Sequence, residues 1–176
     1  MPSKTLTPDN WNEHDETSSF MVSVNRNTGI ERCLTGSGWA AKILEPKLAE
    51  AVPEEVHRLF EVARGSMVYG WFYYPLYTLG SQHLYFVHEA ATTHKCKLAN
   101  APPMKNFSRQ IEWLAKHGYI REERIGQWDA VRALRNGFAH AERQAIYTPG
   151  MAISDVWIAT ELINELFCGE QAQMAK

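Results

Sequence analysis

Residues 128–140 read WDAVRALRNGFAH, and their apolar side chains recur at helical spacing. At about 100° per residue, the four large apolar side chains fall within one broad sector of a helix. They are Trp128, Val131, Leu134 and Phe138. Arg135 lies at the edge of this sector, and polar residues occupy much of the rest. The stretch therefore predicts an amphipathic helix that buries one side and exposes the other.

Four further helices are predicted around this one from apolar periodicity and from start and stop signals. They cover about residues 53–71, 75–98, 106–118 and 151–167, and the helix that contains residues 128–140 runs from about 121 to 142. Pro75 suits a first helical turn, whereas Asn100 with the two prolines after it, and Gly118, are typical of helix ends. The short connections predict an all-α, up-and-down bundle over residues 51–170, followed by a tail at 171–176.

Residues 1–50 show no helical stripe and are expected to form a partly extended arm. Phe20, Val22 and Val24 alternate with polar residues, and a turn signal follows at Asn27-Thr28-Gly29. A short strand or hairpin therefore fits this region, and so does an irregular arm that lies on the domain.

Composition indicates one cytoplasmic domain with no membrane segment. The 176 residues are 45% apolar and carry a net charge of −2, which is typical of one globular domain and gives no global positive field for nucleic acid. Three cysteines without CxxC spacing favour a reduced compartment over a disulfide framework. The longest apolar stretch, near residues 67–79, is interrupted by Gly70 and Pro75, which argues against a membrane span.

The polar face of the 128–140 helix carries the candidate chemistry. Asn136 and His140 are four residues apart and so are neighbours on an exposed face, with Asp129 beside them. Arg135 diverges from His140 by about 140° on an ideal helix. Three arrangements could unite them: a distortion near Gly137, an Arg135 side chain that reaches around the helix, or two copies of the helix at one site.

A row of small residues runs along the same helix at four-residue spacing: Ala133, Gly137 and Ala141. Glycine inside a helix costs roughly 1 kcal/mol relative to alanine, so its presence indicates a close approach by another backbone. Packing within the chain and helix-on-helix dimerisation both explain the row.

The stretch resembles the late helix of HEPN domains, whose signature is an arginine, commonly followed by a polar residue, with a histidine after four to six intervening positions. Arg135, Asn136 and His140 match it, and the resemblance covers roughly residues 54–168. It implies a metal-independent endoribonuclease without a cofactor, in which two protomers join their motifs and leave 2′,3′-cyclic phosphate ends. It also admits an inactive nucleotide-binding, RNA-binding or assembly module. A toxin or defence role with an antitoxin or sensor partner is a further implication.

The residue types suit that reaction. A histidine with a pKa near 6.5 can move protons at cellular pH, and an arginine can fork onto a phosphate as charge accumulates there. An asparagine can orient either the imidazole or a phosphate oxygen. No convincing metal set is present, because His83 and His88, five residues apart, diverge on a helix.

Glu89, Arg132 and Asp129 are expected to support the motif. Glu89 occupies a place where HEPN proteins often carry an acidic or polar residue that faces the motif helix, so it is a candidate partner of Arg135. An ordinary surface glutamate is the alternative.

Basic residues are in modest excess around the motif. Residues 88–143 hold 10 Lys and Arg against 6 Asp and Glu. Lys95, Lys97 and Arg143 are the expected RNA contacts, and Lys105, Lys116 and Arg124 are further candidates. A solvated helix face explains the same charges. The aromatic run at residues 69–77 similarly fits either base stacking or core and dimer packing.

Overall fold

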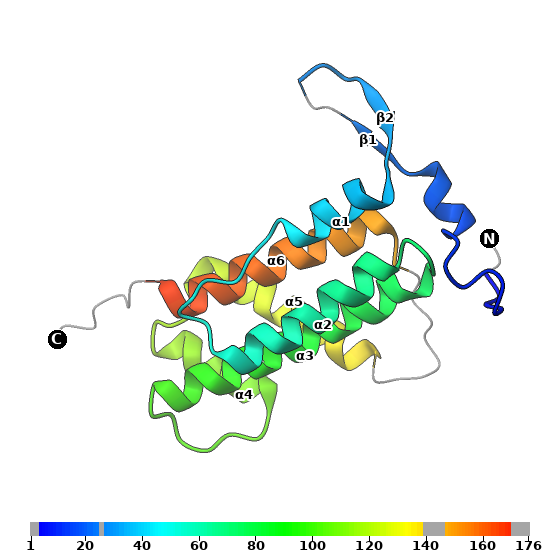
Figure 1. The fold of residues 1–176 in the computed structure, drawn as a ribbon. Coiled ribbons are helices and arrows are strands. Elements are labelled where there is room, and N and C mark those ends of the chain that lie inside the picture. The colour runs from blue at the N-terminus through cyan, green and yellow to red at the C-terminus, as the bar shows by residue number, and fades with distance from the viewer. Residues whose placement is uncertain (1–3, 25–26, 139–146, 170–176) are drawn as a thin grey trace.

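The computed structural model describes residues 4–24, 27–138 and 147–169. Within these ranges the protein is mostly helical, with six packed α-helices and a short N-terminal hairpin (Figure 1). The helices are α1 (Gly36–Leu44), α2 (Glu54–Tyr69), α3 (Pro75–Leu98), α4 (Phe107–Lys116), α5 (Glu122–Phe138) and α6 (Pro149–Cys168). The hairpin pairs β1 (Val22–Val24) with β2 (Glu31–Cys33), and a 3₁₀ turn, η1, spans Glu16–Phe20.

The all-helical prediction is confirmed, and the expected helices between residues 53 and 168 correspond to α2 to α6. Pro75 opens α3 as predicted. Asn100, just after α3, and Gly118, just after α4, adopt left-handed backbone conformations with φ of 54° and 75°, as residues that follow a helix end commonly do. The strands of the described chain lie within the first 45 residues and form a hairpin, which was one of the two alternatives for this region.

The expectation that residues 1–50 form only an arm is wrong at α1. Its Trp39 and Ile43 side chains are fully buried in the same core as the later helices. Thr35 caps the helix by accepting a hydrogen bond from the Gly38 N–H, which offsets the weak helix preference of Gly36 and Gly38. The bundle therefore begins before residue 51.

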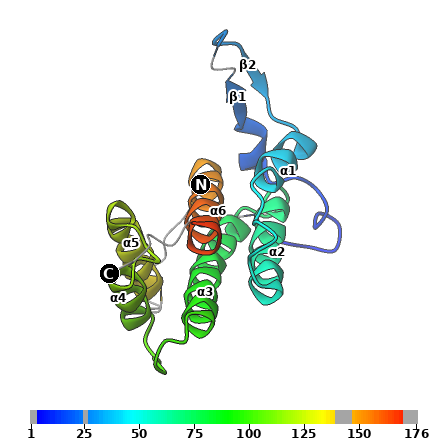
Figure 2. The ribbon, with the colours of Figure 1, turned by 90° about the vertical axis from the view of Figure 1, so that its left-hand side faces the viewer.

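The helices form three layers around α3. Figure 2 shows α3 and α6 in the middle, α1 and α2 on one side, and α4 and α5 on the other. Gly80 lets α2 and α3 pack closely, because a Cβ at this position would lie 2.9 Å from the Ala63 carbonyl oxygen. One long helix thus supports both outer layers, including α5, which carries the motif.

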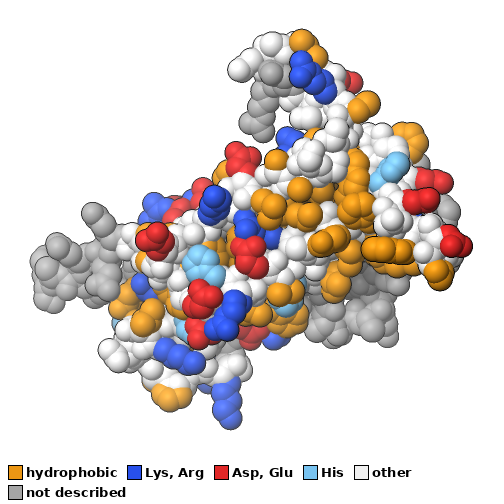
Figure 3. Space-filling view, viewed as in Figure 1, with side chains coloured by type: hydrophobic (Ala, Val, Ile, Leu, Met, Phe, Trp, Pro, Cys, Tyr) orange, Lys and Arg blue, Asp and Glu red, His pale blue; other side chains and the backbone are white. Residues whose placement is uncertain are grey.

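The aromatic run at the α2–α3 turn is partly built into the core. Tyr77 is fully buried, and its ring meets Trp39 edge-on at 5.0 Å between centroids. Tyr69 remains 62% exposed, and hydrophobic side chains gather on this end of the molecule in Figure 3. In the described part of the chain, none of the helices is both long enough and apolar enough to cross a membrane.

Candidate functional site

Helix α5 positions the motif by packing on α3 and α4. Its Trp128 and Val131 side chains are buried, as the apolar sector predicted. Leu134 is 46% exposed, so the prediction of one continuous buried sector is wrong at this residue. The helix thus leaves the core towards its C-terminal end, where Arg135 and Asn136 lie.

Arg135 is held from α3. Its Nη2 lies 3.0 Å from the Oε2 of Glu89, and its Nη1 donates to the Asn136 Oδ1 at 3.3 Å. The expected contact between Glu89 and Arg135 is therefore present. Both side chains are partly accessible, with exposures of 35% for Arg135 and 27% for Glu89. Asn136 is exposed, so two of the three motif residues lie together at the surface.

The remaining motif residue, His140, lies outside the described residues, as do Ala141 and Arg143. Gly137 is described, and a Cβ built on it would meet no described atom within 4 Å. Ala133 is exposed. Among the described residues, these two members of the row thus leave room for a second helix, and both explanations for the row stay predictions.

Arg132 and Asp129 form a local pair. The Arg132 Nε lies 3.2 Å from the Asp129 Oδ1, one helical turn away on α5. No contact of either side chain with Arg135 is recorded among the described residues. His140 lies outside the described residues, so their support for the motif stays a prediction.

The predicted RNA-binding lysines differ in availability. Lys97 is exposed near the end of α3. Lys95 is half-buried, with its Nζ 5.0 Å from the Tyr119 ring centroid and 5.5 Å from that of Phe167. Burial lowers the pKa of Lys95. Lys95 is thus engaged by two aromatic rings, whereas Lys97 is exposed, and its contact with RNA stays a prediction.

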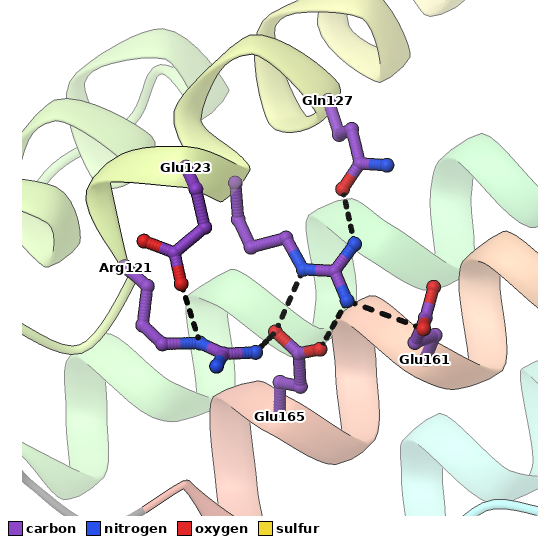
Figure 4. Close-up of polar contacts among 6 residues, drawn as sticks. Arg121, Glu123, Gln127, Glu161 and Glu165 are labelled. Carbon is purple, nitrogen blue, oxygen red and sulfur yellow. Dashed lines mark hydrogen bonds and ion pairs between the residues drawn. The ribbon is translucent and has the colours of Figure 1, made fainter.

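Arg124 is also committed within the fold. Its guanidinium contacts Glu165, Glu161 and Gln127, and Arg121 contacts the same Glu165. Figure 4 labels these partners and Arg121. Burial alone would raise the pKa of Glu165, but hydrogen bonds from the two arginines outweigh it and hold this pKa low. The cluster joins the start of α5 to the end of α6. It pairs the Arg124 guanidinium, which was a candidate phosphate contact, with carboxylates of the same chain.

A second polar group, not singled out from the sequence, lies where α3, α5 and α6 meet. A cavity of about 120 Å³ is lined there by His88, Asp155, Gln127 and Tyr85, with apolar walls that include Leu134 and Ile158. His88 is 2% exposed, and burial lowers its pKa to about 4. Burial also raises the pKa of Asp155 to about 6, although the neighbouring Ser81 hydroxyl opposes this shift.

No group of three or more His, Cys, Asp or Glu side chains within residues 4–24, 27–138 and 147–169 is placed to hold a metal ion. The described side chains at the motif surface provide one guanidinium held by Glu89, one amide and nearby carboxylates. Such a set can bind and orient a phosphate, and it needs a proton-transfer group to cleave one.

Comparison of the chain with protein-family models, with curated proteins and with solved structures finds no match. The functional argument therefore rests on the motif and on the geometry of its described residues.

Proposed function

We propose that this protein is a metal-independent endoribonuclease of the HEPN type, with Arg135, Asn136 and His140 as its reacting groups. The observation that carries the proposal is the accessible Arg135 guanidinium, which Glu89 holds beside Asn136 on the helix of the Arg-Asn-x₃-His motif. A tethered, accessible arginine is suited to receive a phosphate without first having to be ordered.

A purely structural role explains Arg135 less well. Ion pairs this exposed contribute about 0–1 kcal/mol to folding, so the pair with Glu89 adds little stability. The guanidinium has five N–H donors, and the contacts to Glu89 and Asn136 use only part of them. Donors therefore remain for a phosphate oxygen.

In the proposed reaction, His140 moves protons and Arg135 neutralises charge. The 2′-hydroxyl oxygen of RNA attacks the adjacent phosphorus and loses its proton to a base. The bond from phosphorus to the 5′-oxygen breaks, and that oxygen gains a proton. The products are a 2′,3′-cyclic phosphate and a 5′-hydroxyl. Arg135 binds the phosphate as negative charge builds on it, and Asn136 orients either the imidazole or a phosphate oxygen.

The proposed active form is a two-fold dimer that joins two copies of α5. The exposed Ala133 and the open surface at Gly137 support close approach of a second helix. Light scattering at tens of micromolar is expected to give about twice the 20.1 kDa chain mass. A mass of one chain at that concentration contradicts this prediction.

The nuclease proposal is tested by incubating purified protein with total RNA at neutral pH in EDTA. We expect cleavage to continue, because the proposed chemistry uses no divalent ion, and we expect DNA of the same sequence to stay whole, because it lacks the 2′-hydroxyl. Protein carrying both Arg135→Ala and His140→Ala, purified in the same way, controls for contaminating ribonuclease. If the wild-type protein binds RNA and leaves it whole, the inactive binding or assembly module is the correct alternative.

A further inference from the structure

The cavity between α3, α5 and α6 has an interior suited to a small planar ligand. Its volume is about 120 Å³, and cavities of about 150 Å³ in other proteins hold one benzene ring. Leu84, Val131, Leu134 and Ile158 supply apolar walls. Leu134 and Ile158 are 46% and 38% exposed, so the cavity opens to solvent on their side. The enclosed space is somewhat smaller than such a benzene-binding cavity, so a single six-membered ring fits with one edge at the open side.

The polar side chains around this space are mainly hydrogen-bond acceptors. The His88 Nδ1 lies 2.7 Å from the Leu84 carbonyl oxygen, and a carbonyl only accepts, so Nδ1 carries the proton. Because the ring is neutral, its Nε2 is an acceptor. This nitrogen is buried without a hydrogen-bond partner in the described structure, and so is the Asp155 Oδ2. Unpaired buried polar atoms are costly, so a donor that reached either atom would be favoured.

Gln127 adds one donor to this set. Its Oε1 accepts a hydrogen bond from Arg124 at 2.8 Å, so its amide nitrogen is the group left to donate to a ligand. A carboxylate that accepts from the exocyclic amine is the usual protein partner of cytosine. Cytosine is also a single six-membered ring with neighbouring acceptors for an amide N–H. The lining thus complements cytosine better than uracil, which presents a carbonyl oxygen where cytosine presents its amine.

The cavity adjoins the motif. His88 directly precedes Glu89 on α3, and Leu134 directly precedes Arg135 on α5. The same pair of helices therefore holds the cavity on one face and the phosphate-binding arginine on the next. A strand with a phosphate at Arg135 can place a base of the same or the neighbouring nucleotide at the cavity.

We infer that this cavity is a base-recognition site for cytosine, with Asp155, His88 and Gln127 as its specificity-determining residues. The inference rests on the proposed function for its link to RNA. Measuring the binding of free nucleosides tests the site without any RNA cleavage. Asp155 accepts from the exocyclic amine, Gln127 donates to a ring acceptor, and the apolar walls enclose the ring.

The test compares cytidine and uridine binding by calorimetry on the full chain. We expect saturable binding of cytidine at least about tenfold tighter than that of uridine, as one well-placed base contact provides. Asp155→Asn is expected to abolish or invert this preference, because an amide can donate to the uracil carbonyl. Asp9→Asn removes an exposed carboxylate of the N-terminal region and should leave the preference unchanged.

Thermal unfolding shows whether the Asp155→Asn variant is folded. The pKa of Asp155 is raised to about 6 by burial, so the wild type loses stability as pH rises through 6 and the amide does not. The variant should therefore melt at or above the wild-type temperature at pH 8.

Three results would overturn the base site: equal binding of both nucleosides, tighter binding of uridine, or no saturable binding at millimolar concentration. In the last case, water alone occupies the cavity. RNA cleavage without a cytidine preference would reject this site and leave the nuclease standing. Cytidine binding by a protein that leaves RNA whole would support this site and reject the nuclease.

Discussion

Replacing His140 with alanine is expected to slow RNA cleavage by about 10²–10⁴-fold and to leave RNA affinity nearly unchanged. A histidine that transfers protons acts in the transition state and contributes little to ground-state binding. Replacing Arg135 with alanine is expected to reduce cleavage by about 10²–10³-fold, as the loss of one charge-stabilising donor does. It should weaken RNA binding as well, because the guanidinium meets the phosphate in both states.

The salt dependence of binding identifies the phosphate contact. Each neutralised phosphate of a single strand contributes about 0.7 to the slope of log K against log salt. Arg135→Ala should therefore flatten this slope by about 0.7, and His140→Ala should not. Arg58→Ala is a matched control, because Arg58 lies on α2, is 68% exposed and carries the same charge. Figure 2 places α2 on the opposite side of the bundle from α5.

A substitution at Glu89 tests its role in positioning Arg135 separately from the reaction itself. Glu89→Gln keeps the side-chain volume and removes the charge that holds Arg135, so cleavage should fall through looser positioning while the salt slope stays.

If His140→Ala and Arg135→Ala cleave RNA at the wild-type rate, the motif has no catalytic role. If both variants lose stability in proportion to activity, the effect comes from folding instead.

The helices of the bundle could be predicted because their signals are local. Apolar periodicity, Pro75 at a helix start and Gly118 after a helix end lie within a few residues of the structure that they specify. Periodicity also identified the apolar side of α5. It did not show how far a neighbouring helix covers that side, which is why Leu134 is exposed although it lies in the apolar sector.

The polar contacts depend on distant segments, and most were not predictable. His88, Gln127 and Asp155 come from three helices and meet only in the folded chain. No spacing in the sequence links them. The Glu89–Arg135 contact was anticipated only through the resemblance to HEPN domains. Arg124 and Lys95 appeared free in the sequence, because their partners Glu165 and Phe167 lie some 40 to 70 residues further along.

Helix α1 is the clearest case in which tertiary packing overrides local preference. Its first turn contains Gly36 and Gly38, which disfavour a helix, and it is too short to be stable alone. Burial of Trp39 and Ile43 supplies the missing stability. The sequence before residue 51 therefore looked like an arm although part of it completes the core.

This role for α1 predicts that Trp39→Ala will destabilise the whole domain. The Trp39 side chain is fully buried, packs edge-on against Tyr77, and donates its indole N–H to the Met67 carbonyl at 2.9 Å. Its truncation leaves a large cavity, and such changes cost about 3–5 kcal/mol of unfolding free energy. Chemical denaturation followed by helical circular dichroism measures this cost over the bundle as a unit.

Trp11→Ala is the matched control, because Trp11 belongs to the same N-terminal region but is 64% exposed. Its truncation should change the unfolding free energy by less than about 0.5 kcal/mol, as surface substitutions do. A Trp39→Ala cost no greater than that of Trp11→Ala would contradict the contribution of α1 to the stability of the bundle. A large cost in one cooperative transition would instead make residues 36–44 part of the domain, because a loosely attached arm unfolds without affecting the helices beneath it.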